Sequence, residues 1–318
     1  MDIKKGIIII LTFILFRSFS QGVEIQKKFS FLENHDINNF VSSSASLNYF
    51  KSHYHSLDIY YDLYLETTKN DLYNMGFSLR FRKKIIKDTI VSFTFQLKDE
   101  MNENKEIRME IEEKELDFYY VKEKSKWTAL TSVLDSIFEF YEKSIFEKDS
   151  AVFFHNLSLI NDWINLKANG AIAPFQRLRH IDSLVFNINK IQSLKPILIG
   201  KSIRKRGHVF VDHKYTKEKK LPFNKKNANQ TPTFFKQNPT YNWLFESSLD
   251  YATFSSINAY KTVNIKEYEV ENKFNDELNG LKLLNEYENV LIKSLGLIVK
   301  YESKFKQSMQ SLQLCISP

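Results

Sequence analysis

Charged side chains recur at every second position in several short segments of this chain. Arg80 and Arg82 are spaced in this way, and so are Glu269 and Glu271. Residues two apart on a β-strand point to the same side, so each pair is expected to present its charges together. Carboxylate clusters supply the oxygen ligands that Mg²⁺ prefers, and Arg and Lys clusters bind phosphate oxygens. A cavity lined by both kinds of cluster would suit a metal ion bound to a polyphosphate.

The alternation is strongest between Gly76 and Glu113, where three runs follow one another: Phe77–Lys83, Ile90–Lys98 and Ile107–Glu113. In these runs most charged residues keep one parity and most apolar residues keep the other. This pattern predicts β-strands that have one apolar face and one charged face. Five further segments have strand character, namely Val23–Phe29, Leu57–Glu66, Ile197–Val211, Trp243–Ser255 and Thr262–Phe274.

Apolar residues follow a helical spacing in the middle and at the end of the chain. The predicted helical segments are Trp127–Phe146, Val152–Leu166, Phe175–Ile191 and Asp276–Lys306. No repeated strand–helix–strand unit is visible, so an antiparallel arrangement is favoured. The predicted fold class is α+β, with eight antiparallel strands, a central helical segment at residues 114–195 and a C-terminal helix.

The N-terminus has the pattern of a secretory signal peptide. Lys4 and Lys5 precede an apolar run from Gly6 to Phe16, and small residues follow up to Ser20. The run is shorter than the roughly 20 residues that span a bilayer. We therefore expect export, cleavage after residue 20 and no stable membrane span, with an uncleaved anchor as the alternative. The expected organisation is a leader at residues 1–20 and one domain at residues 21–318.

The overall composition excludes some classes of protein. Of the 318 residues, 43% are hydrophobic, which excludes a largely disordered chain. Cys315 is the single cysteine, so no intrachain disulfide forms. The formal charge of +7 favours an anionic partner, although export argues against nucleic acid. Residues 214–240 are rich in Lys, Asn and Gln and are expected to form a polar loop or insertion.

The charged strand faces have two interpretations. In an open antiparallel sheet they would form the solvated outer side, which is common. In a closed barrel only one face points inward. Charged faces that point inward, with helices covering the apolar outside, would make a highly charged tunnel.

The order of the charged motifs resembles the CYTH family, the triphosphate tunnel metalloenzymes. The family's opening pattern E-x-E-x-K is similar to Glu24-Ile-Gln26-Lys-Lys28. Its glycine followed by L-R-x-R is similar to the stretch from Gly76 to Arg82. Further similar pieces, in order, are Gln96-Leu-Lys98, Arg108-Met-Glu110-Ile-Glu112, Arg204-Lys-Arg206, Leu249-Asp250, Glu269-Val-Glu271 and Ser303-Lys304.

The resemblance implies an eight-stranded antiparallel tunnel that hydrolyses a triphosphate or short polyphosphate with Mg²⁺ or Mn²⁺. Inorganic tripolyphosphate and nucleoside triphosphates are the implied substrates, and Glu24 and Lys28 the implied catalytic residues. The implied phosphate-binding residues are Lys28, Arg80, Arg82, Lys98, Arg108, Arg204 and Arg206. The implied metal ligands are Glu24, Glu269 and Glu271, with Glu110, Glu112 and Asp250 holding a second ion or orienting basic residues.

Gln26 departs from the family's pattern, because the second position of its opening motif is a glutamate. An amide oxygen can coordinate a metal ion but brings no charge, so catalysis could be lost through this position. Three hypotheses follow. The first is an exported metal-dependent triphosphatase, and the second is a noncatalytic module that binds polyanions on the same barrel. The third is an exported structural or interaction protein whose charged faces are only solvated. Export suits the scavenging of phosphate from extracellular polyphosphate better than it suits cyclisation of ATP.

Overall fold

The computed structural model describes the chain over several stretches. These are residues 20–31, 37–44, 47, 49–99, 105–112, 124–143, 154–160, 194–218, 241–257, 261–272 and 277–314. The predicted leader before residue 20, the predicted helix Phe175–Ile191 and most of the polar segment 214–240 lie outside them.

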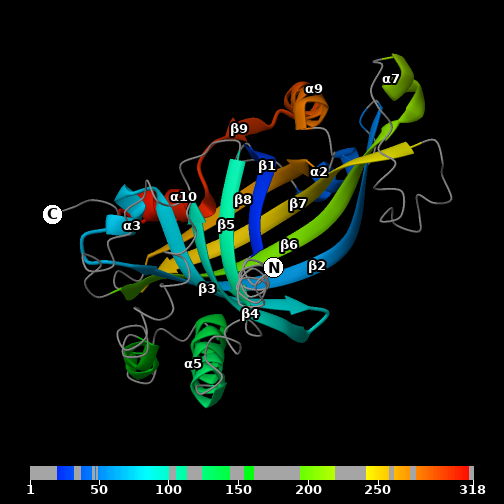
Figure 1. Ribbon diagram of the computed structural model, residues 1–318. Helices are drawn as coiled ribbons and strands as arrows, with labels where there is room; N and C mark the ends of the chain where they lie inside the picture. The colour runs from blue at the N-terminus through cyan, green and yellow to red at the C-terminus, as the bar shows by residue number, and fades with distance from the viewer. Residues whose placement is uncertain are drawn as a thin grey trace, which may run out of the picture.

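One antiparallel sheet of nine strands dominates the fold (Figure 1). Eight of its strands follow the order β5-β4-β3-β2-β6-β7-β8-β1, and β5 also pairs with β1, so these eight close into a barrel. The α+β prediction with eight antiparallel strands is therefore confirmed. The strands are β1 (Ser20–Ser30), β2 (Phe50–Glu66), β3 (Phe77–Ile86), β4 (Thr89–Asp99), β5 (Lys105–Glu112), β6 (Lys195–Asp212), β7 (Tyr241–Ser256) and β8 (Thr262–Asn272).

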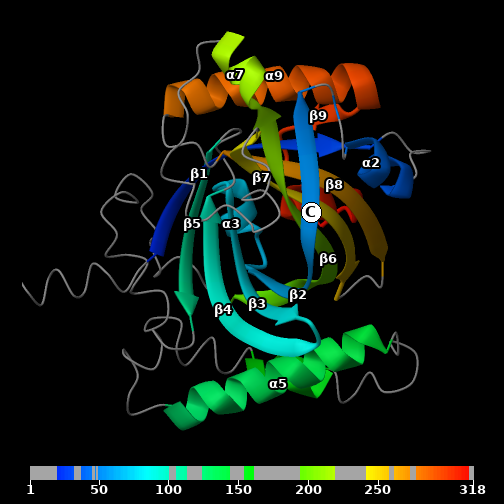
Figure 2. The ribbon, with the colours of Figure 1, turned by 90° about the vertical axis from the view of Figure 1, so that its right-hand side faces the viewer.

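Two helices cover opposite sides of the barrel (Figure 2). Helix α5 (Lys124–Glu142) packs Leu134 and Phe138 on the outward side chains of β2 and β3, including Leu63 and Phe81. Helix α9 (Glu277–Leu295) packs Tyr287 and its apolar neighbours on the outward residues of β1, β7 and β8. Burial of apolar side chains stabilises these contacts by about 25 cal/mol per Å² removed from water. The apolar parity of the strands therefore faces outward, toward the helices.

The C-terminal segment differs from the predicted single helix over Asp276–Lys306. Helix α9 ends at Leu295, and Gly296 follows with φ of 63°. That left-handed conformation favours glycine and ends a helix. A short strand β9 (Ile298–Lys300) then pairs with β1, and a second helix α10 (Lys304–Ser311) begins after Ser303, whose hydroxyl oxygen accepts a hydrogen bond from the Lys306 N–H at 3.2 Å.

Helix α10 closes one end of the barrel. Its residues Phe305 and Met309 pack with Leu312 against inward side chains of β2, β6, β7 and β8, among them Tyr64 and Phe254. The rings of Tyr64 and Phe305 stack with their centroids 4.9 Å apart. In the end-on view of Figure 2, α10 is visible through the barrel at its far end.

The remaining described helices are short. They are α2 (Ile37–Ser44), α3 (Asp71–Asn74), α7 (His213–Glu218) and a helix at residues 154–160. Helix α5 overlaps the predicted segment Trp127–Phe146 but begins three residues earlier, and the helix at residues 154–160 lies within the predicted segment Val152–Leu166. Helix α7 occupies the start of the predicted polar segment. Over the described residues, none of the helices has the length and apolar character needed to cross a bilayer.

Candidate functional site

The strand register brings the predicted charged residues onto one face. Arg82 on β3 lies opposite Asp62 on β2, and Arg80 lies opposite Gln96 on β4. On the other side of the barrel, Asp250 on β7 lies opposite both Arg204 and Glu267. Directly opposed residues of antiparallel strands share a face. Because the other parity packs against α5 and α9, this charged face points into the lumen.

Two arginines of β3 are held in fixed positions by the β2 carboxylate Asp62. Arg82 donates to both Asp62 oxygens at 2.6 and 2.7 Å, and Arg80 lies 3.5 Å from the same carboxylate. Arg80 also donates to the Gln96 amide oxygen and the Tyr64 hydroxyl, both at 2.8 Å. Burial alone would raise the pKa of Asp62, but the charges of Arg80 and Arg82 outweigh it and lower the pKa. The pair of guanidinium groups is thus oriented before any ligand binds.

A second ion-pair network joins β6, β7, β8 and α10. Arg204 donates to both oxygens of Asp250 at 2.8 and 2.6 Å, and Lys304 of α10 lies 2.7 Å from Asp250 and from Glu267. Burial works against the charge of Asp250, yet Arg204 and Lys304 hold its pKa well below the ordinary value. For Lys304, burial is likewise outweighed by Asp250 and Glu267, which raise the pKa of its ammonium group.

Three carboxylates of this network lie close enough to hold one metal ion. Asp250, Glu267 and Glu269 each offer an oxygen within 4.8 Å of the others, and all three are buried. Glu267 is 0% exposed, and its Oε2 atom has no hydrogen-bond partner. Leaving a buried carboxylate oxygen unsatisfied is costly. An all-oxygen donor set with such an atom fits a hard divalent cation such as Mg²⁺ or Mn²⁺.

The Tyr60 ring lies between Arg82 of β3 and Arg204 of β6. This buried ring lies 4.6 Å below the Arg82 guanidinium carbon and 5.5 Å from that of Arg204. Its hydroxyl donates to Asp58 at 3.0 Å and accepts from Arg206 at 2.8 Å. Cation–π contacts of this kind orient guanidinium groups over the ring face. Tyr60 therefore links Arg82 of β3 to Arg204 and Arg206 of β6.

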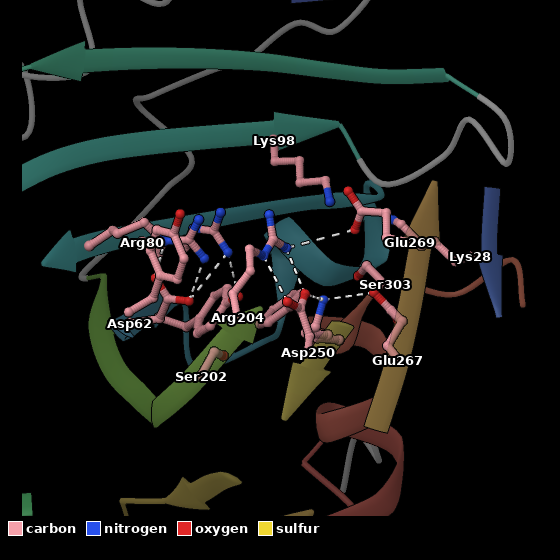
Figure 3. A pocket seen from close by; sticks show the side chains of 15 residues that line it. Lys28, Asp62, Arg80, Lys98, Ser202, Arg204, Asp250, Glu267, Glu269 and Ser303 are labelled. Atoms are coloured by element: carbon pink, nitrogen blue, oxygen red, sulfur yellow. Dashed lines mark hydrogen bonds and ion pairs between the residues drawn. The ribbon is translucent and has the colours of Figure 1, made fainter. Parts of the chain in front are cut away.

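The networks surround one cavity inside the barrel (Figure 3). In that view Lys98 points between Arg204 and Glu269. The empty space among the lining side chains, counted out to the open mouth, is about 530 Å³. The lining residues are Lys28, Tyr60, Asp62, Tyr64, Arg80, Arg82, Lys98, Ser202, Arg204, Asp250, Glu267, Glu269, Ser303, Lys304 and Phe305.

The cavity opens at the end of the barrel away from α10. Side-chain exposure grows in that direction along β3, from 9% for Arg80 to 25% for Lys84, and along β6, from 17% for Arg204 to 36% for Arg206. Arg206 pairs with Asp58 at 2.9 Å, one step closer to the open end than Arg204. A ligand would therefore enter from the Arg206 side and meet Lys304 and Phe305 at the closed end.

Most of the sequence-predicted site residues whose side chains are described line this cavity. They are Lys28, Arg80, Arg82, Lys98, Arg204, Asp250 and Glu269. Arg206 and Glu271 share the inward face but lie nearer the open end, where Glu271 is opposite Gln26 and Glu246.

Four predicted residues lie where only the backbone is described. Arg108, Glu110 and Glu112 of β5 stand opposite Lys98, Gln96 and Thr94, which gives them the inward register of β4. Glu24 of β1 stands opposite Glu106 of β5. Their side chains lie outside the described part of the structure.

Several residues of the cavity were not among those that the sequence predicted. Asp62 and Tyr60 lie in the aromatic run of β2, where polar and apolar residues do not alternate cleanly. Glu267 has the same parity as Glu269, a signal that could have included it among the metal ligands. Lys304 was noted only through the Ser303-Lys304 resemblance, because the helical spacing predicted one unbroken helix there. Its position in the cavity follows from α10 closing the barrel.

Comparisons with known proteins give remote likenesses. No protein-family model and no curated protein matches the chain. Among solved structures, a protein from Pyrococcus horikoshii is 12% identical with a TM-score of 0.38, covering 89% of this chain and 96% of that one. A Bacillus halodurans protein, described as a candidate adenylate cyclase, is 15% identical with a TM-score of 0.38, covering 90% and 97%.

A third likeness is to a Hippeastrum protein, described as a candidate adenylyl cyclase with a dominant triphosphatase activity. It is 14% identical with a TM-score of 0.36, covering 90% of this chain and 94% of that one.

Proposed function

We propose that this protein hydrolyses a triphosphate or short polyphosphate inside the barrel, in a reaction that needs a divalent metal ion. The observation that carries the proposal is the meeting of a buried carboxylate triad and several oriented basic groups in one cavity. On a solvated outer face the carboxylates would be exposed to water. Asp62 and Asp250 are instead 1% and 0% exposed, and each makes a bidentate ion pair with an arginine. The third hypothesis, in which the charged faces are simply solvated, is therefore set aside.

The basic residues are placed to bind the phosphate groups. Arg82 and Arg204 each use one edge of the guanidinium group to grip a carboxylate, which leaves other N–H groups for phosphate oxygens. Lys98 and Lys28 line the same cavity. Oriented positive charges that need no rearrangement stabilise the charge that spreads over a phosphoryl group during transfer.

The carboxylates Asp250, Glu267 and Glu269 would hold the metal ion. Such an ion supplies a positive charge that stabilises the transferring phosphoryl group. In hydrolysis, a water oxygen forms a bond to phosphorus, the bridging P–O bond breaks, and the leaving phosphate keeps the bridging oxygen. Mg²⁺ and Mn²⁺ suit the oxygen donors, and the inward register of Glu110 and Glu112 makes them candidates for a second ion.

Noncatalytic binding of a polyanion is the second candidate function, and Lys304 is the observation that favours it. Its ammonium group lies 2.7 Å from both Asp250 and Glu267, so it pairs with two of the three carboxylates and offsets one of their charges without a metal ion. Gln26, which stands opposite Glu271, also brings no charge to the inward face. Both candidates need a phosphate-rich ligand in the cavity, and only hydrolysis needs the metal ion.

Export of the chain through the predicted leader is also part of the proposal. Extracellular polyphosphate would then be the accessible substrate, and release of phosphate from it the purpose. Detection of the protein outside the membrane, with an N-terminus at Gln21, would support this step.

The experiment that tests the function is phosphate release from tripolyphosphate and ATP, with and without Mg²⁺ or Mn²⁺. We expect metal-dependent release by the wild-type protein and at least a hundredfold loss in the Glu269→Gln variant, because the amide removes a charged ligand. Glu139→Gln, on the exposed side of α5, is the matched control and should leave turnover unchanged. Tripolyphosphate binding without release would favour the noncatalytic candidate, and neither binding nor release would refute both.

A further inference from the structure

A group of histidines lies at the open end of the barrel, away from the carboxylate triad. His53 on β2 stands opposite His208 on β6, which in turn stands opposite Glu246 on β7. Glu246 stands opposite Glu271 on β8. These residues form a belt across four neighbouring strands, at the ends of those strands that lie farthest from α10.

The belt faces the lumen. The Arg206 side chain contacts Tyr60 and Asp58 inside the barrel. His208 is two residues further along β6, and the β6–β7 register has no irregularity between the two residues, so His208 has the same inward direction. The pairing of β2 with β6 is irregular between Tyr54 and Ser56, which leaves His55 as an extra residue. Such bulges redirect a side chain. The His55 ring stacks on the His208 ring, with centroids 4.4 Å apart and planes 25° from parallel.

The imidazoles differ in their exposure to solvent. His55 is exposed, and His53, His208 and Glu246 are half-buried. Neutral imidazole nitrogens are ligands for divalent metal ions.

We propose that His55 and His208, together with the carboxylate of Glu246, form a binding site for a divalent transition-metal ion of the Zn²⁺ type. Two imidazoles bound to one Zn²⁺ at about 2.1 Å place their ring centres roughly 5 Å apart. The two rings stack with their centroids 4.4 Å apart, so a turn of one ring can bring them to the separation that one ion requires. His53, opposite His208, is positioned to supply a fourth ligand. Two to three imidazoles with one carboxylate match the ligand sets that zinc sites use.

One movement is needed for this site to form. Among the described residues, Asp250, Glu267 and Glu269 are the group of three whose ligand atoms already lie within 4.8 Å of one another. The exposed His55 ring would therefore turn from its stacked position so that its nitrogen and that of His208 face the same point. An exposed side chain on a bulge makes this turn at little cost.

The histidine site and the carboxylate triad should select different ions. Imidazole nitrogens favour Zn²⁺, Co²⁺ and Ni²⁺, whereas an all-oxygen set suits Mg²⁺ and Mn²⁺. An ion at the histidines would place positive charge where an anionic ligand enters the barrel. Binding there does not depend on hydrolysis, so the inference can hold whether or not the proposed function does.

The test is titration of the protein with Zn²⁺ in the presence of millimolar Mg²⁺, which occupies oxygen-only sites. We expect one Zn²⁺ per chain and at least a tenfold loss of affinity in both His55→Ala and His208→Ala. Co²⁺ in place of Zn²⁺ should give a visible absorption spectrum typical of nitrogen ligation, which His55→Ala abolishes. Because His55 is exposed, its replacement should not affect folding, and the thermal midpoint checks this.

Two controls decide where the ion binds. His155→Ala, an exposed histidine on the helix at residues 154–160, should bind Zn²⁺ as the wild type does. Glu269→Gln should also bind Zn²⁺ normally. If His55→Ala and His208→Ala retain wild-type Zn²⁺ affinity, or if Glu269→Gln loses it, the assignment of this site is wrong.

Discussion

Arginines in the lumen are oriented by carboxylates that are themselves buried. Asp62 holds Arg82 with two hydrogen bonds, and Asp250 holds Arg204 in the same way. Asp62 is thus a positioning residue, Asp250 combines this role with that of a candidate metal ligand, and each guanidinium keeps donors for a ligand. A lysine cannot replace this arrangement, because an ammonium group is a point charge without two parallel donors.

Arg82→Lys should therefore weaken phosphate binding although it keeps the charge. We expect KM for tripolyphosphate to rise roughly tenfold, because the bidentate contact to Asp62 and the Tyr60 stacking are lost. Steady-state kinetics measure this change. The control is Lys83→Arg on the outward face of the same strand, where Lys83 pairs with Asp135 of α5. An equal rise in KM for both variants would mean that the substrate does not contact the inward face.

Asp250 should make the stability of the protein depend on acid pH. Arg204 and Lys304 lower the pKa of Asp250 in the folded protein below its unfolded value of about 3.9. The stability that results is fully present above the unfolded pKa and is lost as pH falls through the folded pKa. Asp250→Asn should be destabilised at pH 7, and its difference from wild type should shrink between pH 4 and pH 2.

Urea denaturation across this pH range measures that difference. Asp88→Asn is the control, since Asp88 is exposed in the β3–β4 turn with φ of 61°, a conformation that asparagine also adopts. A constant difference between Asp250→Asn and wild type at all pH values would contradict the role given to the two cations.

At the scale of elements, α10 closes the barrel and carries Lys304 into the cavity. Met309 is 0% exposed within the cluster that fills this end. Met309→Ala should lower the free energy of unfolding by about 2–5 kcal/mol, because truncation leaves a cavity. Ser311→Ala, on the exposed side of the same helix, should change it by less than about 0.5 kcal/mol. Equal effects in chemical denaturation would show that α10 does not pack into the barrel.

The strand periodicity predicted the charged and apolar faces well. Arg80 with Arg82, and Leu79 with Phe81, separate onto the two faces as their parity indicates. Alternation failed at Asp62, because aromatic residues occupy both faces of β2 and Tyr60 and Tyr64 are inward residues with apolar bodies. The helical spacing of apolar residues was misleading after Leu295, because this spacing continues past the glycine that ends the helix.

Closure of the barrel depends on contacts that no local pattern contains. The pairing of β1 with β5, and of β1 with β8, joins segments far apart in the chain. Likewise, His208 becomes a neighbour of His53 and His55 only through the β2–β6 register. Sequence patterns therefore predict which faces are charged, while the sites themselves depend on long-range pairing.

At the scale of the whole molecule, the interior carries many like charges that a ligand would neutralise. Lys28, Arg80, Arg82, Lys98 and Arg204 all line one cavity. Tripolyphosphate with Mg²⁺ should therefore raise the melting temperature, with a stabilisation of about 2.7 kcal/mol at one hundred times the dissociation constant. Differential scanning fluorimetry measures the shift. Sulfate at the same ionic strength is the control, and an equal shift with sulfate would indicate a nonspecific salt effect.

Strand β1 also determines when the barrel can exist. It pairs with β5 through its first half and with β8 and β9 through its second half, and its Ser30 hydroxyl lies 3.5 Å from the carbonyl oxygen of Ile298, 268 residues away. A ribosome adds roughly 5–20 residues per second, so tens of seconds separate the synthesis of these partners. During that interval the nascent chain has no closed lumen, and its first strand has an unpaired edge. The barrel is therefore completed only after the residues of β9 have been synthesised, which leaves a long period in which chaperones can hold the chain unfolded.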